Sequence, residues 1–169
     1  HLGKSYDENG SWAASGKVIP VLLEELLSNE YFEKQYPKST GRESFNLELL
    51  AKKKISGRGL KEKPPENIQA TLLQFTAESI RASIEKTAAD SDSPIYICGG
   101  GFYNKFLVKT LRQLFPNRKV DSTRSLGYSP AFLEAVAFSW LAYMRLSNLP
   151  VKLVTSEKVK YLPLGAIHA

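Results

Sequence analysis

The sequence predicts an α/β fold that is rich in helices. The main evidence is a strand, turn, helix and strand in succession: Ile95 to Cys98 form a short apolar run, Gly99-Gly100-Gly101 follow, a helix resumes at Asn104, and Lys119 to Ser122 are again extended. This order is typical of a β-α-β unit, in which the two strands pair in parallel. Strong helical periodicity on both sides of the unit supplies most of the remaining predicted structure.

Length and composition predict one globular domain over residues 1–169. The chain is 43% hydrophobic, which is enough to bury a core. Its one cysteine, Cys98, excludes internal disulfides and fits a reducing compartment, so we expect a cytoplasmic protein. No apolar run approaches the roughly 20 residues of a membrane-spanning helix, so we expect a soluble protein without a membrane partner.

The net charge of +6 requires that nucleic acid be considered as a partner. The basic residues gather around glycines and prolines between Lys52 and Pro65, as in a solvated loop, and Ser56 to Pro65 is the best candidate for a mobile segment. No zinc spacing, recognition helix or RNA-binding aromatic pattern accompanies them. We therefore expect no nucleic-acid partner, and a small anionic ligand remains an open alternative.

Two short helices are predicted near the N-terminus. The first follows a turn after Tyr6 and ends at Gly16, a residue that accepts the left-handed conformation at a helix end. The second begins near Pro20, and its leucines recur at three- and four-residue steps, which gives one apolar stripe with Glu24 and Glu25 outside it.

The longest predicted helix starts at Asn67 as its cap and extends to about Ala89. One continuous face of this helix is predicted to pack closely against a neighbour, because small hydroxyl residues lie among its apolar ones. The face consists of Ile68, Leu72, Phe75, Thr76, Ser79, Ile80, Ser83, Ile84 and Thr87.

The last helix is predicted from Ser129 as cap, with Pro130 in its first position, to about Leu146. Beyond it the chain is extended or looped, with a terminal strand near Leu164 to Ile167. Trp12 and Trp140 are most simply core residues.

The turn Gly99-Gly100-Gly101 is the first candidate site. It follows a strand and precedes a helix, where α/β proteins hold ligands, and three residues without Cβ let a flat or anionic group approach the main chain. A structural turn is the alternative, but three glycines in a row favour a ligand. The spacing does not match a dinucleotide-binding fingerprint, and the nearest acidic residue, Asp121, lies inside the next strand.

Two further side chains have both a structural and a functional interpretation. Asn104 can cap the following helix or turn its amide toward a ligand on the glycines. Glu134 interrupts an otherwise apolar helix, where a carboxylate is costly to bury without a donor. It either points into a polar cleft and contacts a ligand, or forms an ion pair with Arg124 or Arg42.

A second candidate site lies in the segment Pro37 to Asn46. Its composition suits phosphate, although it lacks phosphate-loop spacing and a helix-capping turn is the simpler interpretation. The residues concerned are Lys38, Ser39, Thr40, Gly41 and Arg42. His1, His168 and Cys98 are isolated from one another, so no metal-ligand set or nucleophile triad is predicted.

With these segments together, the chain resembles the C-terminal part of the anhydro-N-acetylmuramic acid kinases, members of the superfamily of sugar kinases, actin and heat-shock chaperone ATPases. The resemblance covers nearly the whole length. It rests on Tyr6 to Val18, Pro37 to Asn46, Gln69 to Ile80, Ile97 to Asn104, Glu134 to Ala142 and Leu164 to Ile167.

The resemblance implies an enzyme of cell-wall recycling that uses ATP and magnesium. Such an enzyme opens the ring of 1,6-anhydro-N-acetylmuramic acid with water and phosphorylates its 6-hydroxyl, giving N-acetylmuramic acid 6-phosphate. It implies that Gly99, Gly100, Gly101 and Asn104 line the adenosine and ribose site. It also implies that Glu134 faces the sugar, that Lys38 to Arg42 lie near the nucleotide, and that the protein is a homodimer.

The same resemblance implies that this chain holds only part of the enzyme, with an incomplete sheet in an actin-like, ribonuclease H-like fold. The N-terminal lobe and the general-base aspartate would lie upstream of His1, so no catalytic residue is expected in this chain. Lys105 stands where the family usually has proline. The second hypothesis, from another functional class, is a non-catalytic actin-like module that binds nucleotide and a protein partner.

Overall fold

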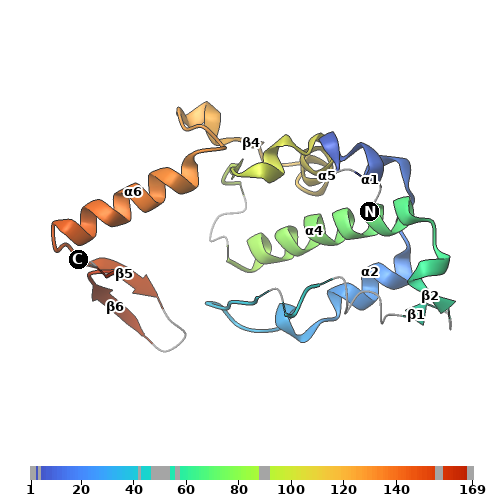
Figure 1. Cartoon of the computed structure of the whole chain (residues 1–169), viewed down its shortest axis with the longest axis horizontal. Helices are drawn as coiled ribbons and strands as arrows, with labels where there is room; N and C mark the ends of the chain where they lie inside the picture. Colours follow the sequence, from blue (N-terminus) through green and yellow to red (C-terminus); the bar gives the residue numbers. More distant parts are fainter. Residues whose placement is uncertain are drawn as a thin grey trace.

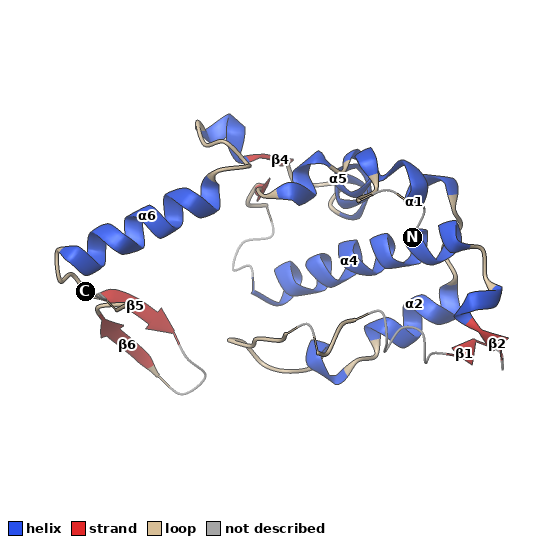
Figure 2. Cartoon of the chain, in the orientation of Figure 1, coloured by secondary structure: helices blue, strands red, loops and turns tan. Residues whose placement is uncertain are grey.

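The computed structural model describes residues 3, 5–41, 43–46, 54–55, 58–87, 92–154 and 158–166. In chain order its helices and strands are α1 (Ser11–Ser15), α2 (Pro20–Leu27), β1 (Lys54–Ile55), β2 (Arg58–Gly59), α4 (Pro65–Thr87), β3 (Ile95–Ile97), α5 (Lys105–Leu114), β4 (Val120–Ser122), α6 (Leu133–Leu146), β5 (Val151–Val154) and β6 (Val159–Leu162) (Figure 2). Short 3-10 helices lie at Glu8–Gly10, Glu30–Phe32, Leu60–Glu62, Gly100–Tyr103 and Thr123–Leu126. The predicted mixture of helices and strands, with helices in the majority, is confirmed.

The helix α4 is the centre of the larger part of the molecule, and α1, α2 and α5 pack around it (Figure 1). Its buried side chains are Ala70, Thr71, Leu73 and Ala77. The predicted face from Ile68 to Thr87 is only partly buried, because neighbours cover α4 from several sides. Thr76 and Thr87 on that face do not mark a packing seam, since both are exposed and their hydroxyls donate to carbonyls one turn earlier.

Helix α1 ends before Gly16 as predicted, but the reason differs from the predicted one. Gly16 has extended backbone angles, φ −93° and ψ 175°, and not left-handed ones. A Cβ at this position would collide with the carbonyl oxygen of Glu66 in the first turn of α4. Glycine is therefore required by the close approach of α1 to α4 and not by a helix cap.

The start of α4 also differs from the prediction, because Pro65 and not Asn67 opens the helix. Proline suits a first turn, whose N–H groups have no partner within the helix. Asn67 then lies inside the helix, and its Oδ1 accepts a hydrogen bond of 2.8 Å from the backbone N–H of Lys17. The predicted cap is wrong, and the side chain instead ties the α1–α2 connection to α4.

The predicted start and apolar stripe of α2 are confirmed. Leu22 is buried with Leu60, and Ile19, Leu26 and Ile68 pack against the pair. Leu60 belongs to the segment predicted as a basic loop. That segment contains the antiparallel pair β1–β2 and a buried leucine, neither of which its composition indicated.

The β-α-β prediction is confirmed. Strands β3 and β4 pair in parallel, with Ile95 opposite Val120 and Ile97 opposite Ser122. Between them α5 packs on α4, and the core joins all of these elements: Ala77, Leu111, Phe115 and Val120 are buried, with Ile80, Ile84, Ile95, Ile97, Leu107 and Leu114 packed against them.

The C-terminal region departs most from the predictions. Helix α6 begins at Leu133, because Ser129 to Phe132 form a turn in which the N–H of Phe132 donates to the carbonyl of Ser129. The predicted cap is therefore wrong, whereas the end at Leu146 is confirmed. The predicted strand near Leu164 is also wrong for its described residues, 164–166, since the last strand is β6, paired antiparallel with β5.

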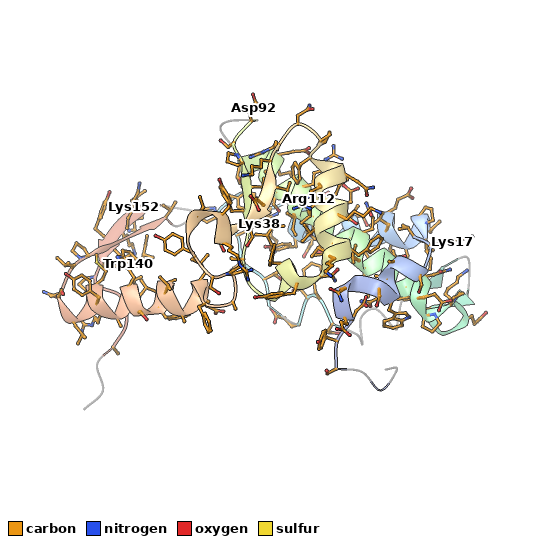
Figure 3. All side chains as sticks on the ribbon, turned by 90° about the horizontal axis from the view of Figure 1, so that it is seen from above. Lys17, Lys38, Asp92, Arg112, Trp140 and Lys152 are labelled. Atoms are coloured by element: carbon orange, nitrogen blue, oxygen red, sulfur yellow. The ribbon has the colours of Figure 1, made fainter. Side chains whose placement is uncertain are left out.

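Helix α6 and the β5–β6 pair lie apart from the helices around α4 (Figure 1). Figure 3 shows the same separation from above, with Trp140 on α6 far from Lys17. Trp140 is half-exposed, so its assignment to the core is wrong: α6 has no buried residue in the described structure. Trp12 in α1 is half-buried.

Within the described ranges the strands form three separate pairs, β1–β2, β3–β4 and β5–β6. This arrangement is consistent with an incomplete sheet. No helix among the described residues combines the length and the apolarity needed to cross a membrane.

Candidate functional site

The carboxyl ends of β3 and β4 form one edge because the two strands are parallel. Since Ile97 pairs with Ser122, the turn that begins at Gly99 and the 3-10 helix Thr123–Leu126 leave the sheet side by side. Loops at this edge are where open α/β sheets bind ligands. The structure therefore adds a second loop to the predicted glycine turn.

Gly99 shapes the turn and does not offer its N–H to a ligand. Its angles, φ 74° and ψ −171°, lie in a region that essentially only glycine adopts. Its N–H donates to the carbonyl of Pro130 at 2.8 Å, and Pro130 is fully buried. Gly99 thus joins the glycine turn to the segment that leads into α6.

Gly100 and Gly101 leave open space above the main chain. Both are exposed, and a Cβ on Gly100 would meet no atom within 4 Å. At Gly101 the nearest atom to such a Cβ would be Leu107 Cδ2, at 3.8 Å. Neither residue has a positive φ, so no turn geometry requires glycine here. Backbone conformation therefore does not explain why these two positions are glycine, and both leave the main chain accessible.

Asn104 has the predicted capping role. Its Oδ1 accepts a hydrogen bond of 2.9 Å from the N–H of Leu107 at the start of α5. Gly10 packs directly against this side chain, and a Cβ there would collide with Asn104 Oδ1. The amide Nδ2 donates to no group in the described part of the chain, so it remains available to a ligand next to Gly101.

Glu134 is exposed in the first turn of α6. The expected conflict between a carboxylate and a buried apolar helix does not occur within the described structure, because α6 is not buried there. Glu134 makes no ion pair with Arg124, and its other predicted partner, Arg42, lies outside the described residues. The hydrogen bond from Gly99 to Pro130 joins the glycine turn to the segment four residues before Glu134.

Lys38 uses its charge inside its own segment. Its ammonium donates to the carbonyls of Tyr31 at 2.8 Å and Phe32 at 3.2 Å, and it lies 4.6 Å from the ring centre of Tyr31 and 5.1 Å from that of Tyr36. Such an ammonium within aromatic rings and carbonyls holds a loop together. Ser39 and Thr40 are exposed beside it.

The part of the chain that holds Lys38, between Phe32 and Phe45, packs on the side of α4 opposite to α5. Phe32 and Phe45 contact Phe75, whereas Ala77, two residues further along α4, faces the core with Leu111. Figure 1 shows the same arrangement, with α4 between α5 and the segment after α2. The described structure therefore places Lys38 and its segment on the other side of α4 from α5, whereas Gly99 is joined by a hydrogen bond to Pro130, just before α6.

Sequence reasoning missed the loop after β4. The hydroxyl of Ser122 accepts from the N–H of Arg124 at 3.1 Å, and Thr123 Oγ1 is buried without a hydrogen-bond partner in the described structure. Arg124 is exposed and forms no ion pair with a described residue. The signal was available, since Ser, Thr and Arg follow an extended segment and Gly127 ends the turn with φ 86°.

Asp121 is committed to local structure. Its Oδ1 accepts from the N–H of Ser122 at 2.7 Å and its Oδ2 lies 3.1 Å from Lys119 Nζ. These contacts, the backbone hydrogen bond first, hold the pKa of Asp121 below its usual range. The carboxylate is thus occupied, in agreement with the argument against a dinucleotide site.

A cluster of three or more His, Cys, Asp or Glu side chains is not found among the residues that the structure describes. Among the described residues the edge thus offers glycine main chain, an amide and an exposed guanidinium, but no acidic cluster for a divalent cation.

Comparison with known proteins decides the family. A family model described as anhydro-N-acetylmuramic acid kinase matches residues 1–169. The chain belongs to this kinase family. Curated anhydro-N-acetylmuramic acid kinases from Aliivibrio fischeri and Pseudomonas syringae pv. syringae are 40% and 43% identical to it, over 172 and 169 residues, and one from Shewanella oneidensis is 45% identical over 150 residues.

The match covers nearly all of this chain but less than half of the relatives. The first two alignments cover 99% of this chain and 45% of each relative, and the third covers 89% and 39%. The chain therefore spans about 45% of the length of these kinases, which confirms the expectation that it corresponds to a part of them.

Proposed function

We propose that this chain is the nucleotide-side part of an ATP-dependent kinase that acts on 1,6-anhydro-N-acetylmuramic acid. In the reaction, water adds to C1, the bond between C1 and O6 breaks, and O6 takes the γ-phosphoryl group of ATP. The products are N-acetylmuramic acid 6-phosphate and ADP. The observation that carries the proposal is the open main chain of Gly100 and Gly101 at a strand edge, in a chain that matches the kinase family throughout.

The proposed roles follow the geometry of the edge. Gly99 fixes the turn, Gly100 and Gly101 accept the adenosine and ribose against bare main chain, and Asn104 turns its free Nδ2 toward them. Glu134 contacts the sugar from the first turn of α6. Because this carboxylate is exposed, the free protein bears no cost for burying it. Its oxygens can accept hydrogen bonds from sugar hydroxyls when the substrate binds.

The segment Lys38 to Gly41, with Arg42, is retained as a part of the nucleotide site of the whole enzyme. In the described structure Lys38 is bound to the carbonyls of Tyr31 and Phe32. Its direct contribution therefore requires that the segment change its contacts when nucleotide binds. A supporting role, in which Lys38 holds the segment and Ser39 and Thr40 contact phosphate, requires no such change.

Magnesium accompanies ATP in the proposed reaction, but the described residues do not fit a magnesium site of their own, because no acidic cluster is present among them. Phosphate oxygens and residues outside the described part would hold the ion. The general base is likewise proposed to lie outside this chain. Because phosphoryl transfer depends on positioning by both walls of a cleft, we expect this chain alone to lack activity.

The whole enzyme is proposed to have an actin-like fold, to work as a homodimer in the cytoplasm, and to serve cell-wall recycling. A non-catalytic nucleotide-binding module is the second candidate. Glu134, a carboxylate in an otherwise apolar helix, favours the enzyme, since a module that only assembles has no need of it.

The experiment uses a joined protein, in which this chain is fused in register to the part of the Pseudomonas syringae relative that lies outside the match. ATP binding is measured by calorimetry for the joined protein and for two variants, Gly100→Leu and Gly59→Leu. Both glycines face open space, so both variants should fold. We expect Gly100→Leu to weaken ATP binding by at least about tenfold and Gly59→Leu to leave it unchanged. Equal ATP affinity in both variants would refute the nucleotide assignment of this edge.

A further inference from the structure

Helix α6 carries a stripe of large apolar side chains that the described structure leaves uncovered. The stripe consists of Phe132, which directly precedes the helix, and Val136, Tyr143 and Leu146 within it, and these residues are 67%, 48%, 62% and 75% exposed. Their spacing of four, seven and three residues places them on one side of the helix. Soluble proteins rarely expose so continuous an apolar surface unless it binds something.

The other side of α6 differs from this stripe. Glu134 and Arg145 lie about half a turn away from it, and the half-buried Leu141 and Met144 also point away from it. The β5–β6 pair lies beside the C-terminal end of the helix (Figure 1). The side with Glu134 and Arg145 also carries Phe138, which is 64% exposed, so α6 is apolar around most of its circumference, and the stripe is largely exposed in the described part of the chain.

Two occupants could cover the stripe: a second copy of this chain, or a different polypeptide surface. A second copy is disfavoured by net charge, because each chain carries +6 and two such chains repel one another.

The relatives point to the other occupant. More than half of each relative's length lies outside the match, whereas 99% of this chain is inside it. A helix that is apolar on most of its circumference is normally buried within a larger protein. Since the described part of the chain does not bury it, the remaining part of the same kinase polypeptide is the surface available to do so.

We propose that the stripe Phe132, Val136, Tyr143 and Leu146 packs against the part of the kinase polypeptide that lies outside the matched residues. In this arrangement α6 is the contact between the two parts. The same packing orients Glu134, because it fixes the rotation of α6 about its axis. The inference rests on family membership and is independent of which nucleotide or sugar is bound.

The test measures amide hydrogen exchange of α6 in this chain alone and in the joined protein, at equal concentration. We expect exchange across residues 133–146 to slow by at least about tenfold in the joined protein. Protection that appears in this chain alone and rises with its concentration would show that a second copy covers the stripe. Equal exchange in the two proteins would also overturn the proposal.

Two matched variants of the joined protein identify the face. Tyr143→Asp changes the stripe, and Phe138→Asp changes a residue of nearly equal exposure, 64% against 62%, on another side of the same helix. We expect Tyr143→Asp to abolish the added protection and Phe138→Asp to keep it. Loss of protection in both variants would overturn the assignment of the contact to the stripe.

Discussion

Individual glycines in this chain serve different purposes, and the backbone distinguishes them. Gly99 is required by its conformation and Gly16 by the close approach of α4. Gly10 is required both by its conformation, with φ 72°, and by the close approach of Asn104 and Phe106 at the start of α5. Gly100 is required by neither. The same residue type therefore marks structure at three positions and access to the main chain at the fourth.

Gly10→Ala tests the structural use of glycine. An added Cβ would collide with Asn104 Oδ1 and lie 2.7 Å from Phe106 Cβ, in a backbone conformation that alanine disfavours. We expect the free energy of unfolding to fall by about 2–4 kcal/mol, measured by urea denaturation. Gly59→Ala, where nothing lies nearby, should change it by less than about 0.5 kcal/mol. A loss of stability of similar size in both variants would contradict this account.

Asp121 gives a prediction for pH. Hydrogen bonding by the N–H of Ser122, and then Lys119, lowers the pKa of the folded-state carboxyl below its value of about 3.9 in an unfolded chain. The lowered pKa stabilises the fold above about pH 4, and that stabilisation is lost as the pH falls through the folded-state pKa.

The free energy of unfolding of Asp121→Asn should therefore fall less steeply than that of the parent as the pH drops below about 4, as measured by denaturation at several pH values. Asparagine can still accept the hydrogen bond from Ser122, so the comparison isolates the charge. If the free energy of unfolding falls equally steeply with pH in the two proteins, Asp121 makes no such contribution.

At the scale of elements, α4 is held to the N-terminal helices by polar contacts as well as by apolar packing. Thr71 is fully buried, accepts a hydrogen bond of 2.9 Å from the N–H of Ile19, and donates one of 2.7 Å to the carbonyl of Asn67. Asn67 accepts from the N–H of Lys17. These two side chains satisfy the backbone just before α2.

Thr71→Val keeps the shape of the side chain and removes its hydroxyl. The N–H of Ile19 then loses its acceptor in a partly buried position, so we expect a loss of about 1–3 kcal/mol in the free energy of unfolding. Thr71→Ser should recover most of the hydrogen bonding, and Thr76→Val on the exposed side of α4 serves as the control. A Thr71→Val variant as stable as Thr76→Val would contradict this role of the hydroxyl.

The elements predicted well are those with strong local signals. Periodicity gave α2, α5 and the end of α6, and the glycine turn after a short apolar run gave the β3–α5–β4 unit. Errors occurred where a contact distant in sequence decided the outcome. Asn67 was assigned as a cap because its bond to Lys17 is not visible in local sequence, and Trp140 was assigned to a core that the described structure does not place around it.

Part of the geometry of the candidate site was predictable. Three glycines in succession indicated the turn after β3, and Asn104 was predicted to cap the helix that follows, α5. The loop after β4 was missed because its position depends on the register of β3 with β4, which no local pattern contains. The position of the Lys38 segment on the other side of α4 from α5 was also not predictable, since it follows from the packing of Phe32 and Phe45 on Phe75.

At the scale of the whole molecule, the described structure consists of a packed body around α4 and a C-terminal region that lies apart from it (Figure 1). The glycine turn belongs to the body and Glu134 to the other region, and the hydrogen bond from Gly99 to Pro130 joins them. In our proposal, a site that needs both is organised by what α6 packs against.

The most direct test of the central claim is phosphoryl transfer by the joined protein, supplied with ATP, magnesium and 1,6-anhydro-N-acetylmuramic acid and followed by mass spectrometry. We predict a sugar product that has gained one phosphoryl group and one water. We also predict that Glu134→Gln lowers kcat/KM for the sugar by about 10- to 100-fold, whereas Glu24→Gln on the exposed side of α2 does not change it. A folded, ATP-binding joined protein that leaves the sugar unmodified, or that is indifferent to Glu134→Gln, would contradict the account.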